Sequence, residues 1–139
     1  MGVNYWAILG AAIATFVFGA VWYTALASPW RQALGKSEAE LKSTGRPMPL
    51  LFAITFVGQL IMAWVLAGLM LHLAKAGVAA TPRNGMLSGA FCWLGFVATT
   101  LAVNHGYQGA RWMLTVIDGG YWLGVLLIQG LIVGWLGVR

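Results

Sequence analysis

Four runs of sequence without any Asp, Glu, Lys or Arg set the strongest limit on what this chain can fold into. They are Met1–Trp30, Pro47–Ala74, Asn84–Ala110 and Gly119–Val138. An α-helix needs about 20 apolar residues to cross the hydrocarbon of a bilayer, and each run is at least that long. The runs are rich in Leu, Ala, Val, Ile and Gly and do not alternate between polar and apolar residues. This pattern predicts membrane helices rather than the strands of a membrane β-barrel.

Composition supports the same class. Only 8% of the 139 residues are charged and 60% are hydrophobic, whereas a soluble domain carries about a quarter charged residues. We therefore expect one all-α domain over residues 1–139, an integral membrane bundle of four transmembrane helices. A short interfacial helical segment is expected between the first two spans. The expected spans lie at about residues 5–27, 50–74, 85–103 and 116–138, and the expected hydrophilic loop at 28–49.

The loop at residues 28–49 is the most hydrophilic part of the chain. Ser37 followed by Glu40 matches a capping box, and Ser28-Pro29 is typical of a helix start, so one or two short helices are expected there. The loop is interpreted as a plain connector with a solvated polar face. A lid or a partner-docking segment is the alternative.

The boundaries of the last two spans depend on two polar stretches. Asn104-His105-Gly106 is expected to end the third span, with Gly106 as its C-terminal cap. Thr115 is a candidate N-cap for the fourth span, which would place Asp118 in its first turn. The stretch between them is expected to be interfacial and not to span the membrane.

The distribution of basic residues predicts an orientation. Four spans place both ends of the chain on one side of the membrane. The loop between spans one and two, with Arg111, carries five basic side chains, whereas Lys75, Arg83 and Arg139 lie on the other side. The positive-inside rule then puts the long loop in the cytoplasm and both termini outside, in a bacterial inner membrane. The net charge of +5 is scattered and makes no patch for nucleic acid, so lipid headgroups are the expected partners.

The candidate ligand-binding residues cluster around the junction of the third and fourth spans. They are Asn104, His105, Arg111, Asp118 and Tyr121. An ionisable side chain within a span marks a functional site by default, because it is costly in hydrocarbon. A helix cap or an ion pair with Arg111 is the bland alternative for Asp118. For His105, a hydrogen-bonded helix end is the alternative to a pH-sensitive gate. No metal site is expected, since one carboxylate and one histidine do not make a ligand set.

Two further groups of residues point to helix packing. Gln59 and Gln129 are mid-span amides that must find hydrogen-bond partners in an apolar bundle. Small residues recur along the fourth span, at Gly120, Gly124, Gly130 and Gly134. We expect this span to be tightly packed, either inside the bundle or across a homodimer interface.

Several short motifs occur in an order typical of one family. They are Asn4-Tyr5-Trp6, Trp22-Tyr23, Pro29-Trp30-Arg31, Leu34-Gly35, Trp93-Leu94-Gly95-Phe96, Asn104, Gly109-Ala110-Arg111 and Asp118-Gly119-Gly120-Tyr121. On these residues the whole chain resembles the small bacterial membrane proteins catalogued as domain of unknown function 1761. It departs from the family pattern at Tyr107-Gln108, where an aromatic–acidic pair would be expected. The resemblance implies a four-helix membrane protein and supplies no activity.

No catalytic constellation is evident in the sequence, so no enzyme activity and no cofactor are expected. The leading functional hypothesis is an accessory or structural component that acts through helix–helix and lipid contacts, and a homodimer is expected. The alternative is a transporter or binder of a small molecule or ion, with a polar site between spans three and four.

Overall fold

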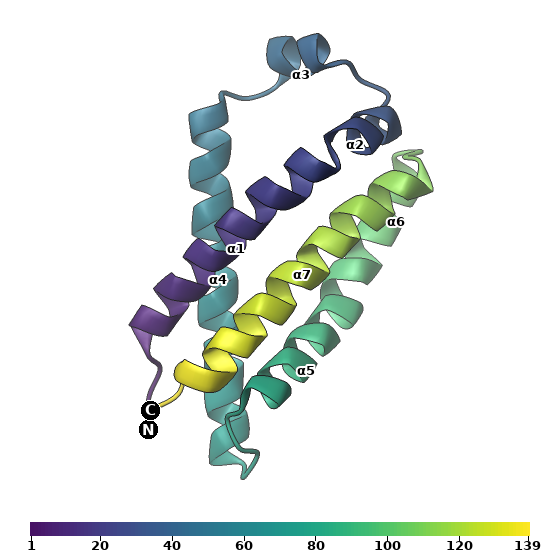
Figure 1. The fold of residues 1–139 in the computed structure, drawn as a ribbon. Helices are drawn as coiled ribbons and strands as arrows, with labels where there is room; N and C mark the ends of the chain where they lie inside the picture. Colours follow the sequence, from purple (N-terminus) through teal and green to yellow (C-terminus); the bar gives the residue numbers. More distant parts are fainter.

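The chain folds into a bundle of four long helical segments (Figure 1). The computed structural model describes all residues from Met1 to Arg139. The first, second and fourth segments are α1 (Tyr5–Ala25), α4 (Met48–Lys75) and α7 (Trp112–Leu136). The third consists of α5 (Pro82–Cys92), the π-helical turn η1 (Trp93–Ala98) and α6 (Thr99–Tyr107). All four are long and apolar enough to cross a membrane, and the predicted all-α, four-span architecture is confirmed.

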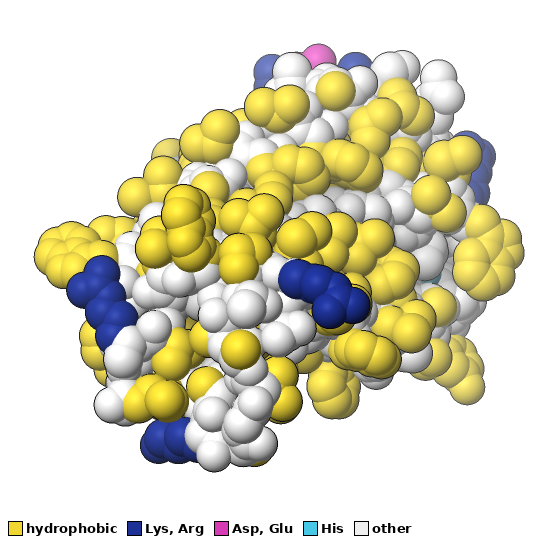
Figure 2. All heavy atoms as spheres, turned by 60° about the horizontal axis from the view of Figure 1, so that its bottom comes forward, with side chains coloured by type: hydrophobic (Ala, Val, Ile, Leu, Met, Phe, Trp, Pro, Cys, Tyr) yellow, Lys and Arg dark blue, Asp and Glu magenta, His cyan; other side chains and the backbone are white.

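The outer surface of the bundle is apolar. Only 25 of the 139 residues are buried, and large side chains such as Trp6, Phe91 and Phe96 are more than 70% exposed. Figure 2 shows isolated basic side chains among hydrophobic ones on the face that it displays. An aqueous solvent does not tolerate apolar surface on this scale, whereas lipid chains do.

Helix α7 is the centre of the bundle. It packs against α1, α4 and α5, and Figure 1 shows it between α1 and the third segment. Ten of its 25 residues are buried, including Val125, Val133 and the amide side chain of Gln129. The other helices are therefore arranged around α7.

Glycines bring the backbones of α5 and α7 into direct contact. A Cβ at Gly85 would overlap the carbonyl oxygen of Gly130, and a Cβ at Gly134 would lie 3.0 Å from the Cα of Gly85. Gly89 faces the backbone of Leu126 in the same way. Of the two arrangements considered for the small residues of the fourth span, the structure uses them inside the bundle. These glycines are consequently not free to form an interface between two copies.

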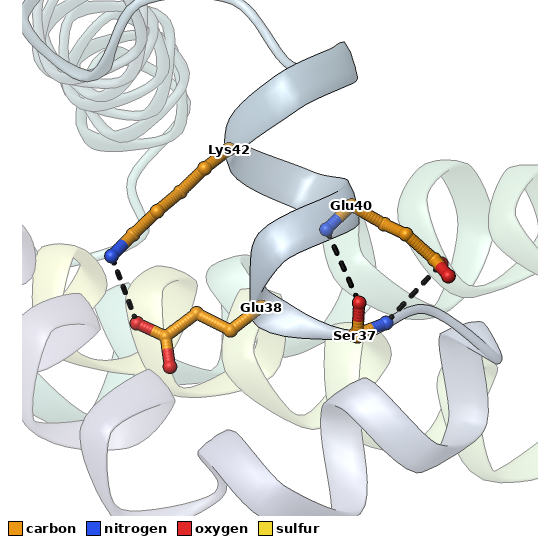
Figure 3. Close-up of polar contacts among 4 residues, drawn as sticks. All are labelled: Ser37, Glu38, Glu40 and Lys42. Atoms are coloured by element: carbon orange, nitrogen blue, oxygen red, sulfur yellow. Dashed lines mark hydrogen bonds and ion pairs between the residues drawn. The ribbon is translucent and has the colours of Figure 1, made fainter.

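The hydrophilic loop contains two short helices, α2 (Ala27–Leu34) and α3 (Glu38–Thr44), as the sequence predicted. Helix α2 ends at Gly35, whose φ of 69° favours glycine, and packs against α7. The Ser37 hydroxyl accepts from the Glu40 backbone N–H, and the Glu40 carboxylate accepts from the Ser37 N–H, which confirms the capping box (Figure 3). Glu38 and Lys42 pair at 3.2 Å on the same exposed helix.

The predicted break at Asn104-His105-Gly106 is wrong. The helix continues to Tyr107 because a backbone in hydrocarbon must satisfy its own hydrogen bonds. Gly109, with a φ of 68°, ends it. The Ala110 N–H donates to the His105 carbonyl at 2.9 Å, and the Gly109 N–H donates to the Gly106 carbonyl at 3.1 Å. The cap predicted for Gly106 therefore lies three residues further on.

The predicted start of the fourth span is also wrong. Helix α7 begins at Trp112 with Arg111 as its N-cap residue, and no side chain caps it. Thr115 is therefore inside the helix. Asp118 lies in its second turn, about 9 Å from Trp112 along the axis at 1.5 Å per residue.

Residues near the N- and C-termini pair with each other at the end of the bundle opposite α2 and α3. Val3 and Val138 form an isolated antiparallel bridge. The Asn4 side-chain oxygen accepts from the Trp6 N–H at 3.1 Å, and its Nδ2 donates to the Leu136 carbonyl at 2.8 Å. One amide thus caps the start of α1 and satisfies a carbonyl in the last turn of α7.

The contact between α5 and α7 predicts a sharp difference between two Gly→Ala substitutions. Gly85→Ala should destabilise the protein in detergent by about 1–3 kcal/mol, because the new methyl group overlaps the Gly130 backbone. Gly58→Ala, where no atom lies within 4 Å of the new Cβ, should cause no loss. Thermal unfolding followed by tryptophan fluorescence measures both, and equal stability of the two variants would contradict the packing.

Candidate functional site

A cavity of about 600 Å³ lies between α1, α4 and α7. Its lining comes from the second half of α1, the first turns of α4 and the first half of α7, so it lies toward the end of the bundle where α2 and α3 are found (Figure 1). The third segment contributes only Leu101, so the cavity is not centred between spans three and four as the sequence suggested. The lining residues are Phe16, Gly19, Ala20, Tyr23, Thr24, Met48, Phe52, Thr55, Leu101, Asp118, Tyr121 and Trp122.

Asp118 is the one ionisable carboxylate in the spans, since the other two acidic residues, Glu38 and Glu40, lie in α3. The Tyr23 hydroxyl donates to its Oδ1 at 2.7 Å. A charged residue at the centre of a span costs about 2.5–3.5 kcal/mol on insertion scales. The carboxylate is half-buried in the wall of the cavity, where a ligand can reach it.

Asp118 is neither a helix cap nor the partner of Arg111 in an ion pair. The residue lies beyond the first turn of α7 and caps nothing. It makes no ion pair with Arg111, whose Nη1 donates to the Gln32 carbonyl at 2.7 Å and so joins the start of α7 to α2. The only ion pair in the chain is the one between Lys42 and Glu38.

Two indole groups fix the backbone on either side of Asp118. Trp22 of α1 donates from Nε1 to the Ile117 carbonyl at 3.1 Å, and Trp93 of η1 donates to the Gly119 carbonyl at 2.8 Å. A side chain at Gly120 would place its Cβ 3.0 Å from the Trp22 ring. Gly120 thus lets the Trp22 ring approach α7 closely, which gives the second glycine of the Asp-Gly-Gly-Tyr motif a structural role.

Tyr121 is the centre of an aromatic cluster beside the carboxylate. Its ring lies edge-on to Tyr23, with centroids 5.0 Å apart, and parallel to Phe18 at 6.0 Å. Gly19 of α1 makes room for it, since a Cβ there would lie 3.0 Å from the ring. Such pairs favour one defined arrangement of rings and so hold the cavity wall in place.

A chain of buried amides continues from Tyr121 into the bundle. Gln59 donates from Nε2 to the Tyr121 hydroxyl at 2.7 Å, and Gln129 donates to the Gln59 backbone carbonyl at 3.0 Å and to the Thr15 hydroxyl at 3.3 Å. Both side chains are fully buried. The Oε1 atom of each has no hydrogen-bond partner in the structure. The chain joins α1, α4 and α7 through polar contacts in an apolar interior.

The structure brings only some of the predicted ligand-binding residues together. Asp118 and Tyr121 both line the cavity. His105 instead pairs through Nδ1 with the Thr115 hydroxyl at 2.9 Å, and Asn104 is exposed. The Arg111 side chain donates to the Gln32 carbonyl of α2, as described above. No group of three or more His, Cys, Asp or Glu side chains could hold a metal ion.

Sequence reasoning missed the contribution of α1 and α4. Trp22 and Tyr23 stood out in the sequence only as one of the short motifs of the family resemblance. An available signal was the occurrence of two aromatic residues near the end of one span and of an acid with an aromatic in another. Only the packing of α1 on α7 shows that these residues meet.

The family model described as "Protein of unknown function (DUF1761)" matches residues 6–134. The chain belongs to this family. The matched range includes every residue that lines the cavity and both indoles that flank Asp118. A search of curated proteins and a search of solved structures found no match.

The hydrogen bond between Tyr23 and Asp118 predicts a measurable coupling. Tyr23→Phe should cost about 1.5–3 kcal/mol of stability, because it removes the one donor to a charged acceptor. The same substitution in an Asp118→Leu background should cost close to nothing. Thermal unfolding of the four proteins gives the coupling energy. Tyr107→Phe serves as the control, since that side chain is 94% exposed.

Proposed function

We propose that this chain is a non-enzymatic membrane protein that binds a small molecule in the Asp118 cavity. The observation that carries the proposal is the position of the carboxylate. The one acidic side chain of the spans lies in the wall of a cavity and has a single hydrogen bond and no counter-charge. Polar groups in membrane spans are costly and mark binding or transport pathways.

The size and lining of the cavity support this proposal. Small-molecule sites occupy about 300–1,000 Å³ and combine apolar walls with a few polar groups. Here about 600 Å³ is lined by eight hydrophobic residues out of twelve, with Asp118 as the charged one. The carboxylate is also held in place, by Tyr23 at the side chain and by Trp22 and Trp93 at the adjacent backbone.

The distribution of basic residues supports an orientation for the site. Arg31, Lys36, Lys42, Arg46 and Arg111 belong to the connections at the end where α2 and α3 lie. We propose that this end faces the cytoplasm of a bacterium, and that both chain termini lie outside. The cavity then lies in the cytoplasmic half of the bundle.

One of the arguments for the accessory role that the sequence favoured no longer applies. It rested partly on the glycine faces of the fourth span, and those glycines pack against α1 and α5 of the same chain. A homodimer remains a proposal. Its interface must use surfaces other than the glycines of α7 that face α5.

Filling the cavity tests the proposed function. Ala20→Phe places a ring in the cavity and should remove any small molecule that co-purifies with the protein in mild detergent. Ala53→Phe adds the same ring on the outer surface of α4 and should leave that molecule bound. Native mass spectrometry reports the bound mass and the oligomeric state together.

Two results would contradict the proposal. One is wild-type protein that carries no small molecule and binds none when it is incubated with a delipidated extract of the membranes or cytosol of the source cells. The other is a bound molecule that Ala20→Phe and Ala53→Phe retain equally. In either case the accessory role would become the better explanation.

A further inference from the structure

The cavity has an unbalanced negative charge. Asp118 is the only charged residue in its lining, and no cationic nitrogen lies within 4.0 Å of the carboxylate. The basic groups nearest in sequence are engaged elsewhere, since Arg111 bonds to Gln32 and His105 to Thr115. A chain with a net charge of +5 thus leaves its one carboxylate in the spans without a basic partner.

One carboxylate oxygen is free for a ligand. Tyr23 donates to Oδ1, and Oδ2 makes no hydrogen bond to the protein. The remaining polar groups of the lining are neutral. They are the hydroxyls of Thr24, Thr55 and Tyr121 and the indole N–H of Trp122, and the Thr55 hydroxyl donates to the Leu51 carbonyl. The site therefore offers acceptors and no cationic donor.

The aromatic lining, like the carboxylate, favours a positively charged ligand. Phe16, Tyr23, Phe52, Tyr121 and Trp122 all line the cavity. The face of an aromatic ring attracts a cation, most strongly where water is excluded. A carboxylate among aromatic rings is a common arrangement for holding an ammonium group, because each supplies negative potential and the rings also accept apolar substituents.

We propose that the ligand of this cavity is an organic monocation, an ammonium group attached to an apolar body. Its charged nitrogen lies against Asp118 and its body contacts the aromatic rings and Met48. This proposal rests on the proposed function, because it names the chemical class of the small molecule that the cavity binds. It goes beyond it by requiring one positive charge.

A pair of isosteric probes isolates the charge. Benzyltrimethylammonium is the cationic probe, and neopentylbenzene, in which carbon replaces the nitrogen, is the neutral one. Binding is measured by equilibrium dialysis of the protein in uncharged detergent. The amount bound by Ala20→Phe is subtracted, so that partitioning into micelles does not count as binding to the cavity.

Charge-removing variants then identify the partner of the probe. Asp118→Asn keeps an oxygen that can accept from Tyr23, so the fold should persist. Asp118→Ala is a second variant in case the first unfolds. Glu38→Gln removes an equal charge from exposed α3 and is the matched control. Thermal unfolding establishes that each variant is folded.

The expected result is saturable binding of the cation that falls at least about tenfold in Asp118→Asn and is unchanged in Glu38→Gln. The neutral isostere should bind at least about tenfold more weakly than the cation to the wild-type protein. Equal binding of both probes, blocked by Ala20→Phe and independent of Asp118, would overturn the cationic ligand while the proposed function survives. If neither probe binds in the cavity, the cationic ligand is also overturned. The co-purified mass would then decide the proposed function separately.

Discussion

The close contact between α5 and α7 is the constraint on which the rest of the bundle depends. In a bilayer, apolar side chains gain little by leaving lipid for one another, so helices associate through close packing and polar contacts. Gly85 and Gly89 on one helix and Gly130 and Gly134 on the other allow the backbones to touch. This fixes α7 as the central helix, against which α1 and α4 then pack.

The polar groups of the interior follow from this arrangement. With α7 at the centre, Gln129 can reach the backbone of Gln59 and the hydroxyl of Thr15, so one amide contacts two neighbouring helices. Asp118 lies toward the opposite end of the same helix, in the wall of the cavity. The bundle thus has a small network of hydrogen-bonded side chains in its apolar interior and one carboxylate that is left accessible.

The spans and the capping box were predictable because both depend on local sequence. The helix ends around Asn104 and Thr115 were not, because polar residues that would end a helix in water are tolerated within one that must satisfy its backbone in lipid. The candidate site was predicted in part. Asp118 and Tyr121 line the cavity, whereas His105 and Arg111 form separate contacts at the neighbouring turns.

The sequence by itself determined a four-span helical membrane protein and made Asp118 conspicuous, since charge-free length and an acid within a span need no partner to be recognised. Tertiary structure decided what surrounds that acid. Tyr23 is 95 positions away from Asp118, and only the packing of α1 on α7 brings its hydroxyl to 2.7 Å from the carboxylate. The packing of α1 and α5 on α7 turned the glycines of α7 inward, because the direction a helix face points is set by its neighbours and not by its own residues.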